Sequence, residues 1–204
     1  MVARLEEGLE ALADLVGGHQ GSESRLARRM PRPRVVSSRV VYENRWMRLH
    51  EDRLELPDGG AGLYAWIEKP PAAVIVPRDG DHLWLIEQHR HPVGRRFWEF
   101  PQGAWEDAPD APAEDLARGE LGEETGLRAA RMERLGTLFF AYGMSDQRFD
   151  VWLATGLEPG PPAPEATEHD LRSARVSVAE FEAMIRRGEV ADAASVAAWH
   201  LVTR

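Results

Sequence analysis

Three glutamates, Glu120, Glu123 and Glu124, lie three and four positions apart in a stretch whose pattern predicts a helix. At about 100° of rotation per residue, their side chains emerge within one third of the helix circumference. Like charges at this spacing repel one another, and they lie toward the helix C-terminus, where the dipole disfavours anions. The spacing leaves two interpretations open, a solvated acidic face or a face that binds a divalent cation. Carboxylate oxygens without a neighbouring histidine favour Mg²⁺ or Mn²⁺ over zinc or copper.

Arginines and a tryptophan outside that helix are candidates for binding a phosphorylated ligand that carries an aromatic base. Arg90, Arg95 and Arg96 come shortly before the acidic helix, and guanidinium groups bind phosphate through paired hydrogen bonds. Trp46 offers a ring on which a base can stack. The alternative for each is structural, namely a surface arginine or, in a chain with 7 tryptophans, a packed core residue.

The composition of the chain excludes several other chemistries. None of the 204 residues is cysteine, so thiolate catalysis, disulfides and cysteine-bound zinc are ruled out. The single lysine, Lys69, is followed by a proline, which excludes a phosphate-binding Gly-Lys-Ser/Thr loop. With 25 Lys and Arg against 34 Asp and Glu, the net charge is −9. A nucleic-acid partner is therefore not expected, because nucleic-acid surfaces of proteins are basic.

The sequence shows neither a membrane span nor an export signal. No apolar run approaches the roughly 18 residues that a membrane-spanning helix needs. The N-terminus already contains Arg4, Glu6 and Glu7 and leads into no apolar signal core. We therefore expect no membrane partner and a cytoplasmic location.

The N-terminal third is predicted to contain a helix, a linker and a small antiparallel sheet. Residues 3–16 place apolar side chains three or four apart and end at Gly17-Gly18, which is typical of an amphipathic helix. A polar linker interrupted by prolines follows. Alternation with period two then predicts strands at 34–43, 46–56 and 63–69.

The rest of the chain is predicted to form a mixed sheet with few helices, which is an α+β arrangement. A helix over 112–125 carries the three glutamates and stops at Gly126, and a capping box at Ser177 opens another that Gly188 ends. Further strands are expected at 72–77, 83–88, 97–101, 132–140, 148–156 and 172–178, and a last helix at 192–202. We divide the chain into an N-terminal helix and linker (1–34), a small sheet (35–69) and a main domain (70–204).

The segment around the acidic helix resembles the signature of the Nudix hydrolases. Phe100-Pro101-Gln102-Gly103 is followed by a loop and then by a helix that ends Glu120-Leu121-Gly122-Glu123-Glu124-Thr125-Gly126-Leu127. The resemblance implies an α/β/α sandwich in which the three glutamates bind Mg²⁺, with the Gln102 carbonyl as a further ligand and Gly103 at the substrate. Two positions depart from the signature: Gly119 stands where the family has arginine, and Ala111 stands where it has a loop glutamate. Arg118, Glu106 and Asp107 are the candidates to replace them.

The resemblance extends to the ADP-ribose (ADP-sugar) diphosphatase branch of this family. Residues 41–59 look like the small N-terminal sheet of that branch, and Glu87-Gln88-His89-Arg90-His91-Pro92 also resembles a segment of it. The resemblance implies a homodimer in which each N-terminal sheet helps to build the partner's site. A general base must come from an acidic loop that can close over the metals. Glu168, after the proline-rich stretch 159–164, is our candidate, with Glu165 and Asp170 as alternatives.

Taken together, these features predict Mg²⁺-dependent hydrolysis of the diphosphate bond of a nucleoside diphosphate linked to another group. The expected substrate is a small nucleotide, ADP-ribose or another ADP-sugar, and the products are a nucleoside monophosphate and a sugar phosphate. Two alternatives stay open. One is a Nudix hydrolase of dinucleotide polyphosphates or capped RNA ends, and the other is a non-catalytic nucleotide sensor, which the departures at Gly119 and Ala111 would suit.

Overall fold

The structure, a computed structural model, describes residues 31–160 and 171–204. Three of the sequence-based expectations lie outside these residues: the helix at 3–16, nearly all of the linker, and the loop acids Glu165, Glu168 and Asp170.

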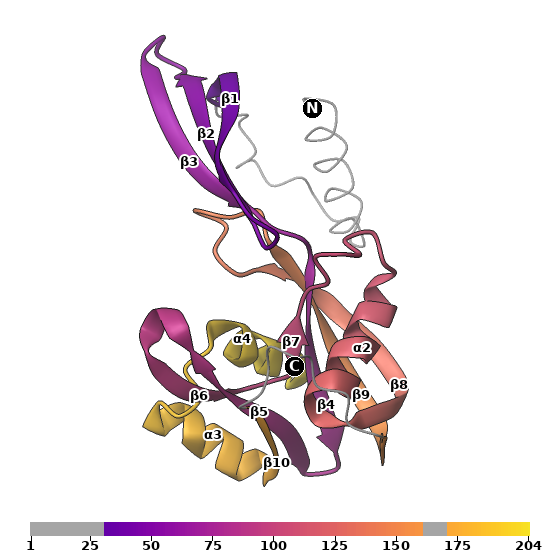
Figure 1. Cartoon of the computed structure of the whole chain (residues 1–204). Helices are drawn as coiled ribbons and strands as arrows, with labels where there is room; N and C mark the ends of the chain where they lie inside the picture. The colour runs from indigo at the N-terminus through magenta and orange to yellow at the C-terminus, as the bar shows by residue number, and fades with distance from the viewer. Residues whose placement is uncertain (1–30, 161–170) are drawn as a thin grey trace, which may run out of the picture.

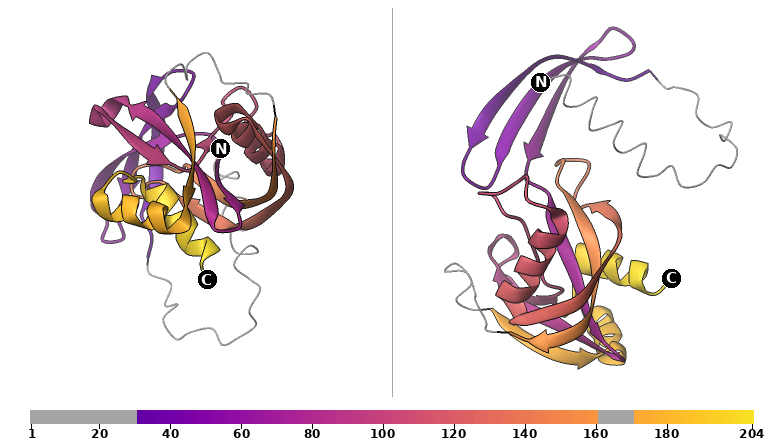
Figure 2. Two further views of the ribbon diagram at one scale, coloured as in Figure 1. Left: turned by 90° about the horizontal axis from the view of Figure 1, so that it is seen from below. Right: turned by 90° about the vertical axis from the view of Figure 1, so that its right-hand side faces the viewer.

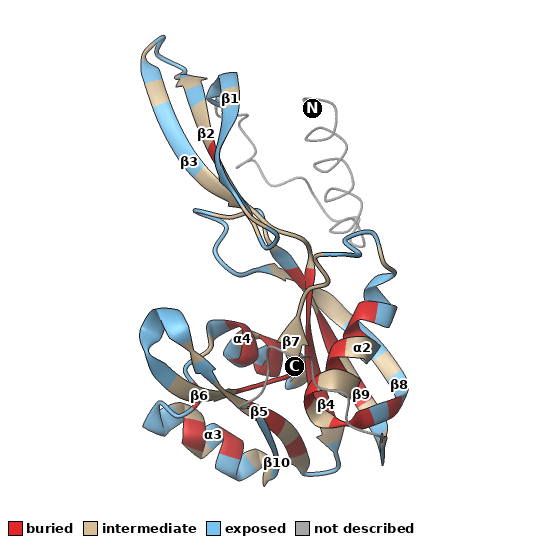
Figure 3. Ribbon diagram, viewed as in Figure 1, coloured by how far each residue is buried: buried red, intermediate tan, exposed pale blue. Residues whose placement is uncertain are grey.

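A three-stranded antiparallel sheet extends from one end of the molecule (Figure 1). It consists of β1 (Arg34–Glu43), β2 (Arg48–Glu55) and β3 (Ala61–Glu68) in sequence order. The Asp58-Gly59 turn between β2 and β3 closes because Gly59 adopts a φ of 84° and the Asp58 carboxylate accepts a hydrogen bond from the Gly60 amide at 2.9 Å. This small sheet is mostly exposed, and His50 is the single buried residue of these three described strands (Figure 3).

The larger sheet is mixed, as predicted. Its main path runs β10-β5-β4-β9-β8, with β6 added beside β5 and β7 beside β4. The β4 and β9 strands are parallel, whereas the other strand pairs of this sheet are antiparallel in the described part of the chain. The strands are β4 (Ala72–Asp79), β5 (His82–Arg90), β6 (Arg95–Glu99), β7 (Gln102–Gly103), β8 (Leu127–Phe139), β9 (Arg148–Pro159) and β10 (Arg172–Ser177).

The helices begin and end where the local signals predict. The α2 helix (Ala113–Thr125) ends at Gly126, whose φ of 69° is left-handed. The α3 helix (Val178–Arg187) begins at Ser177, whose side chain accepts a hydrogen bond from the Glu180 amide at 3.1 Å. The α4 helix (Ala193–Val202) follows, and a short 3₁₀ turn (His91–Val93) connects β5 to β6. None of the described helices is long and apolar enough to cross a membrane.

The larger sheet has a core on each face, because helices cover both sides. Along β4, Val74 and Val76 pack into the core with α3 and α4, whereas Ala73 and Ile75 pack into the core with α2. A strand buried on both faces is apolar at successive positions, which explains the continuous Ala72–Val76 run. Figure 1 and the two views of Figure 2 show α2 on one side of the sheet and α3 and α4 on the other. The predicted α/β/α sandwich is confirmed.

Several strand ends differ from those that the sequence pattern predicts, and the two-residue β7 was not predicted. The β8 strand begins at Leu127 rather than 132, directly after the Gly126 turn, and β6 begins at Arg95 rather than Phe97. The added residues include Arg95, Arg96, Arg128 and Arg131, whose charged side chains obscure the pattern, although Leu127 and Ala129 are buried. Main-chain pairing with β9 and β5 maintains the strands regardless of these side chains.

The loop between β8 and β9 joins the two sheets. The Ile67 amide donates to the Met144 carbonyl at 2.8 Å, and the Lys69 amide donates to the Asp146 carboxylate at 3.1 Å. Burial of Asp146 raises the pKa of its carboxyl group, although the Lys69 amide counteracts that effect. These bonds attach the end of β3, and with it the small sheet, to the β8–β9 loop of the larger sheet.

Candidate active site

The three glutamates of α2 differ in burial. Leu116, Ala117 and Leu121 seat the helix on the sheet and are at most 7% exposed. With that face turned inward, Glu120 and Glu124 become buried polar side chains, 6% and 4% exposed, and Glu123 stays partly accessible. A buried carboxylate is costly unless a donor or a cation compensates its charge. The solvated-face interpretation therefore does not describe Glu120 and Glu124.

The short β7 strand brings its backbone against two of these carboxylates. Pairing with β4 holds this strand in place. Just before the strand, the Pro101 carbonyl accepts a hydrogen bond from the Ile75 amide of β4 at 2.9 Å. The Gln102 amide donates to Glu124 Oε2 at 2.8 Å. A Cβ atom on Gly103 would lie 2.3 Å from Glu120 Oε2, far inside van der Waals contact. Position 103 must therefore be glycine for the Glu120 carboxylate to lie where it does.

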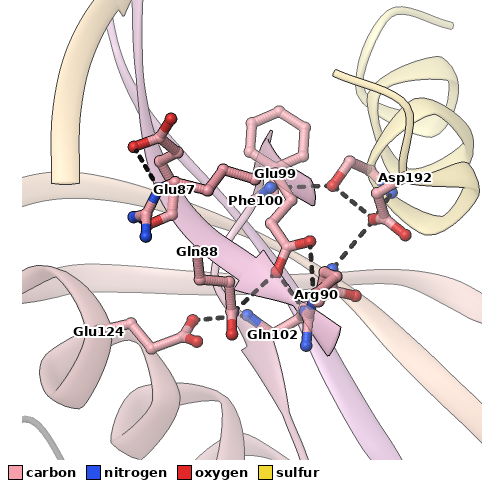
Figure 4. A network of polar contacts seen from close by, with 10 residues as sticks. Glu87, Gln88, Arg90, Glu99, Phe100, Gln102, Glu124 and Asp192 are labelled. Atoms are coloured by element: carbon pink, nitrogen blue, oxygen red, sulfur yellow. Dashed lines mark hydrogen bonds and ion pairs between the residues drawn. The ribbon is translucent and has the colours of Figure 1, made fainter. Parts of the chain in front are cut away.

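A polar network from the C-terminal helix holds this strand from the other side (Figure 4). The Gln102 side chain donates to Asp192 Oδ2 at 3.0 Å, and the same oxygen accepts from the Ser195 amide at 2.8 Å. The fully buried Ser195 hydroxyl in turn accepts a hydrogen bond from the Phe100 amide at 2.9 Å. Sequence reasoning missed these contacts, because Asp192 is recognisable as a helix cap but nothing in the sequence shows that the cap also holds Gln102.

Arg90 is fixed by a buried carboxylate that the sequence analysis did not identify. Glu99 is 2% exposed and forms an ion pair with Arg90 through both carboxylate oxygens, while the Gln88 side chain donates to Glu99 at 2.9 Å. Burial raises the pKa of Glu99, and the Arg90 charge works against that rise. The paired contact orients the guanidinium group before any ligand arrives.

Arg90 and the Gln102-Gly103 strand line one cleft of about 680 Å³, together with Glu99, Lys69 and Glu106. A neighbouring cavity of about 460 Å³ shares Lys69 and Glu106 with this cleft and is lined by Trp46. The two cavities together offer room for the two halves of an elongated ligand.

Two of the predicted arginines do not themselves line this cleft. Arg95 and Arg96 are not among the described residues that line the cleft. Arg95 lies over the Phe97 ring at 5.2 Å and is exposed. Arg96 donates to Glu87 Oε2 at 3.1 Å, and strand alternation places it on the face of β6 opposite Glu99.

The donors suit a hard divalent cation, which prefers oxygen ligands. Two buried carboxylates, Glu120 and Glu124, lie against the Gln102-Gly103 strand, which has no Cβ at Gly103, and Glu123 is partly exposed on the same helix. Within residues 31–160 and 171–204, no three His, Cys, Asp or Glu side chains form a ready-made metal cluster. Arg118, a candidate to replace the arginine of the signature, is bound to Glu114 and to the Ala129 carbonyl at 2.8 Å each.

Family profiles match nearly the whole described chain. Residues 34–67 match the nucleoside diphosphate sugar hydrolase N-terminal domain, and residues 68–199 match the NUDIX domain. The chain belongs to the Nudix hydrolase family. The resemblance stated from the sequence is thereby confirmed, and the chain is an enzyme of the hydrolase class.

Individual relatives agree with this assignment. The Nudix chain is 35% identical over 174 residues to the "ADP-ribose pyrophosphatase" of Mycobacterium tuberculosis, covering 83% of this chain and 84% of that protein. It is 33% identical over 121 residues to the "CMP-5'-(N-acetyl-N-hydroxy-3-aminopropyl)phosphonate hydrolase" of Streptomyces rubellomurinus, covering 59% and 58%. A solved "ADP compounds hydrolase" superposes with a TM-score of 0.74 at 24% identity, covering 89% of this chain and 95% of that one, and shows the fold.

Proposed function

We propose that this Nudix hydrolase cleaves the diphosphate bond of ADP-ribose or another ADP-sugar with Mg²⁺. The observation that carries the proposal is that Glu120 and Glu124 lie against the Gln102-Gly103 strand, and that this strand lines the same cleft as Arg90. The name of the Mycobacterium tuberculosis relative supports the choice of ADP-ribose. A water molecule attacks one phosphorus, the bridging P–O bond breaks, and a nucleoside monophosphate and a sugar phosphate leave.

In this proposal the acidic helix and the adjoining strand hold the metal. Glu120, Glu123 and Glu124 are the carboxylate ligands, and the Gln102 carbonyl is a further ligand. When bound, Mg²⁺ neutralises phosphate charge and lowers the pKa of the attacking water, and Mn²⁺ can replace it. The Gln102 amide holds Glu124 in place through the 2.8 Å hydrogen bond.

Other side chains bind and orient the substrate. Arg90, oriented by Glu99, contacts a phosphate oxygen, and Trp46 stacks on the base in the neighbouring cavity. Gly103 lets the substrate approach the backbone. Glu168, in the loop outside the described residues, is the proposed general base. Arg95 and Arg96 are proposed to bind substrate only at the outer part of the site.

A hydrolysis panel tests the proposal. We expect the protein with Mg²⁺ to cleave ADP-ribose faster than CMP conjugates, dinucleotide polyphosphates or capped RNA, with both products identified by mass spectrometry. EDTA is expected to abolish the activity, and excess Mg²⁺ or Mn²⁺ to restore it, because the proposed reaction depends on a bound divalent cation. Preferential cleavage of another substrate would overturn the choice of ADP-sugar, and tight binding of ADP-ribose without turnover would indicate a sensor.

We further propose a homodimer formed through the small sheet, in a cytoplasmic protein without nucleic-acid or membrane partners. Support comes from apolar side chains on β1 and β3 that are 42–64% exposed: Val35, Val36, Val40, Val41, Tyr42, Leu63 and Tyr64. Exposed apolar groups gathered on one sheet are typical of protein interfaces. Light scattering should give twice the mass of one chain, and Leu63→Arg should yield monomers, whereas Val196→Arg, at an exposed position of α4, should not. A monomeric native protein would contradict this.

A further inference from the structure

An aromatic ring of the loop that connects β7 to α2 lies directly against the helix. The indole of Trp105 lies against Gly119, so that a Cβ atom on Gly119 would be 2.2 Å from Trp105 Cζ2, 3.0 Å from Cη2 and 3.2 Å from Cε2. Trp105 also packs against the core on the α2 side of the sheet. The ring therefore occupies the volume into which any side chain at position 119 would extend.

This contact lies next to the acidic face of the helix. Gly119 directly precedes Glu120, and Glu123 follows it by four positions, so Gly119 and Glu123 share one side of α2. At its other end, Trp105 is two residues from Gly103, the glycine that accommodates the Glu120 carboxylate. One ring thus connects the strand and the helix that together carry the proposed metal ligands.

The backbone of Trp105 also takes part in the turns of this loop. The Trp105 carbonyl accepts a hydrogen bond from the Ala108 amide at 3.2 Å, and the Ala108 carbonyl accepts one from the Ala111 amide at 3.0 Å. Glu106, the next residue, lines both the cleft and the neighbouring cavity. Displacing Trp105 would therefore move Glu106 and loosen the approach of Gly103 to Glu120.

We infer that Trp105, seated on Gly119, is a positioning residue for the metal-binding face of this enzyme. The absence of a side chain at position 119 is then required by Trp105, and Gly119→Arg is expected to lower activity because the arginine needs the space of the ring. The inference rests on the proposed function in one respect, namely that the acidic face binds a divalent cation.

Mn²⁺ affinity, measured by electron paramagnetic resonance without substrate, tests this inference. We expect Gly119→Ala to weaken Mn²⁺ binding about tenfold, because the methyl group displaces Trp105. Gly122→Ala, in the same helix, is the matched control and should bind within twofold of the native protein, since its Cβ would meet only the Leu127 carbonyl at 3.8 Å. Trp105→Phe removes the ring atom nearest to Gly119, so adding Gly119→Ala to that variant should weaken binding less than twofold further.

Equal Mn²⁺ affinity of Gly119→Ala and Gly122→Ala would overturn the inference, as would an undiminished effect of Gly119→Ala in the Trp105→Phe protein. Should Gly119→Ala alone not fold, folding of the double variant supports the steric contact, and failure of both contradicts it. A native protein that binds Mn²⁺ but cleaves no ADP-sugar would overturn the proposed substrate and leave this inference in force.

Discussion

Glu124→Gln is expected to lower kcat by at least about a hundredfold, the scale on which the loss of a catalytic group acts. The substitution keeps the shape of the side chain, and the amide oxygen can still accept the hydrogen bond from Gln102. What disappears is the negative charge, at a side chain that is 4% exposed and that we propose as a metal ligand. Initial rates with ADP-ribose over a range of Mg²⁺ concentrations measure the effect.

Glu114→Gln is the matched control for this prediction. Glu114 belongs to the same helix but is exposed, and its charge pairs with Arg118 at the surface. Loss of such an exposed pair changes stability by about 0.3–0.5 kcal/mol and should leave kcat within twofold. If Glu124→Gln were as active as Glu114→Gln, Glu124 would have no role in binding the metal.

Gly103→Ala is expected to cost about a hundredfold in kcat, although it adds only a methyl group. Its Cβ would lie 2.3 Å from Glu120 Oε2 and 2.6 Å from both Cδ and Oε1. Either the carboxylate or the strand must move by about 1 Å, and a displacement of that size can cost about 10² in rate. Overpacking of this kind also destabilises a protein by about 1–3 kcal/mol, which urea unfolding would measure.

Gly136→Ala separates this steric effect from the general cost of replacing a glycine. A Cβ atom on Gly136 would meet only Leu201 Cδ1, at an ordinary 3.7 Å. We expect this control to retain native kcat and native Mg²⁺ dependence. Native activity of Gly103→Ala would show that Glu120 does not need its close approach to the backbone.

Local patterns in the sequence were sufficient for the elements and for the family. Helix α2 begins after Pro112 and ends at Gly126 as predicted, because proline and glycine at these positions act through the backbone of their own turn. The cap at Ser177 is equally local. The ends of β6 and β8 were misplaced, because hydrogen bonds to a neighbouring strand, and not side-chain pattern, determine where a strand stops.

The candidate site, too, has features that the sequence predicts and features that depend on tertiary contacts. Spacing along one helix was enough to place Glu120, Glu123 and Glu124 on one face. Spacing could not predict that Glu99 orients Arg90, or that Asp192 holds Gln102 across 90 residues of chain. Such pairs depend on which strands and helices become neighbours in the fold, and a single sequence does not show this directly.

The sequence by itself determined the acidic helical face, the order of the described strands and helices other than β7, and the family, since each rests on residues close together in the chain. Only the tertiary structure decided that Gly103 accommodates Glu120, that Trp105 fills the space above Gly119, and that Arg95 and Arg96 are not among the described residues lining the cleft. The physical reason is steric. Whether a side chain fits, and which face of a strand it occupies in the folded protein, depends on atoms brought together by packing.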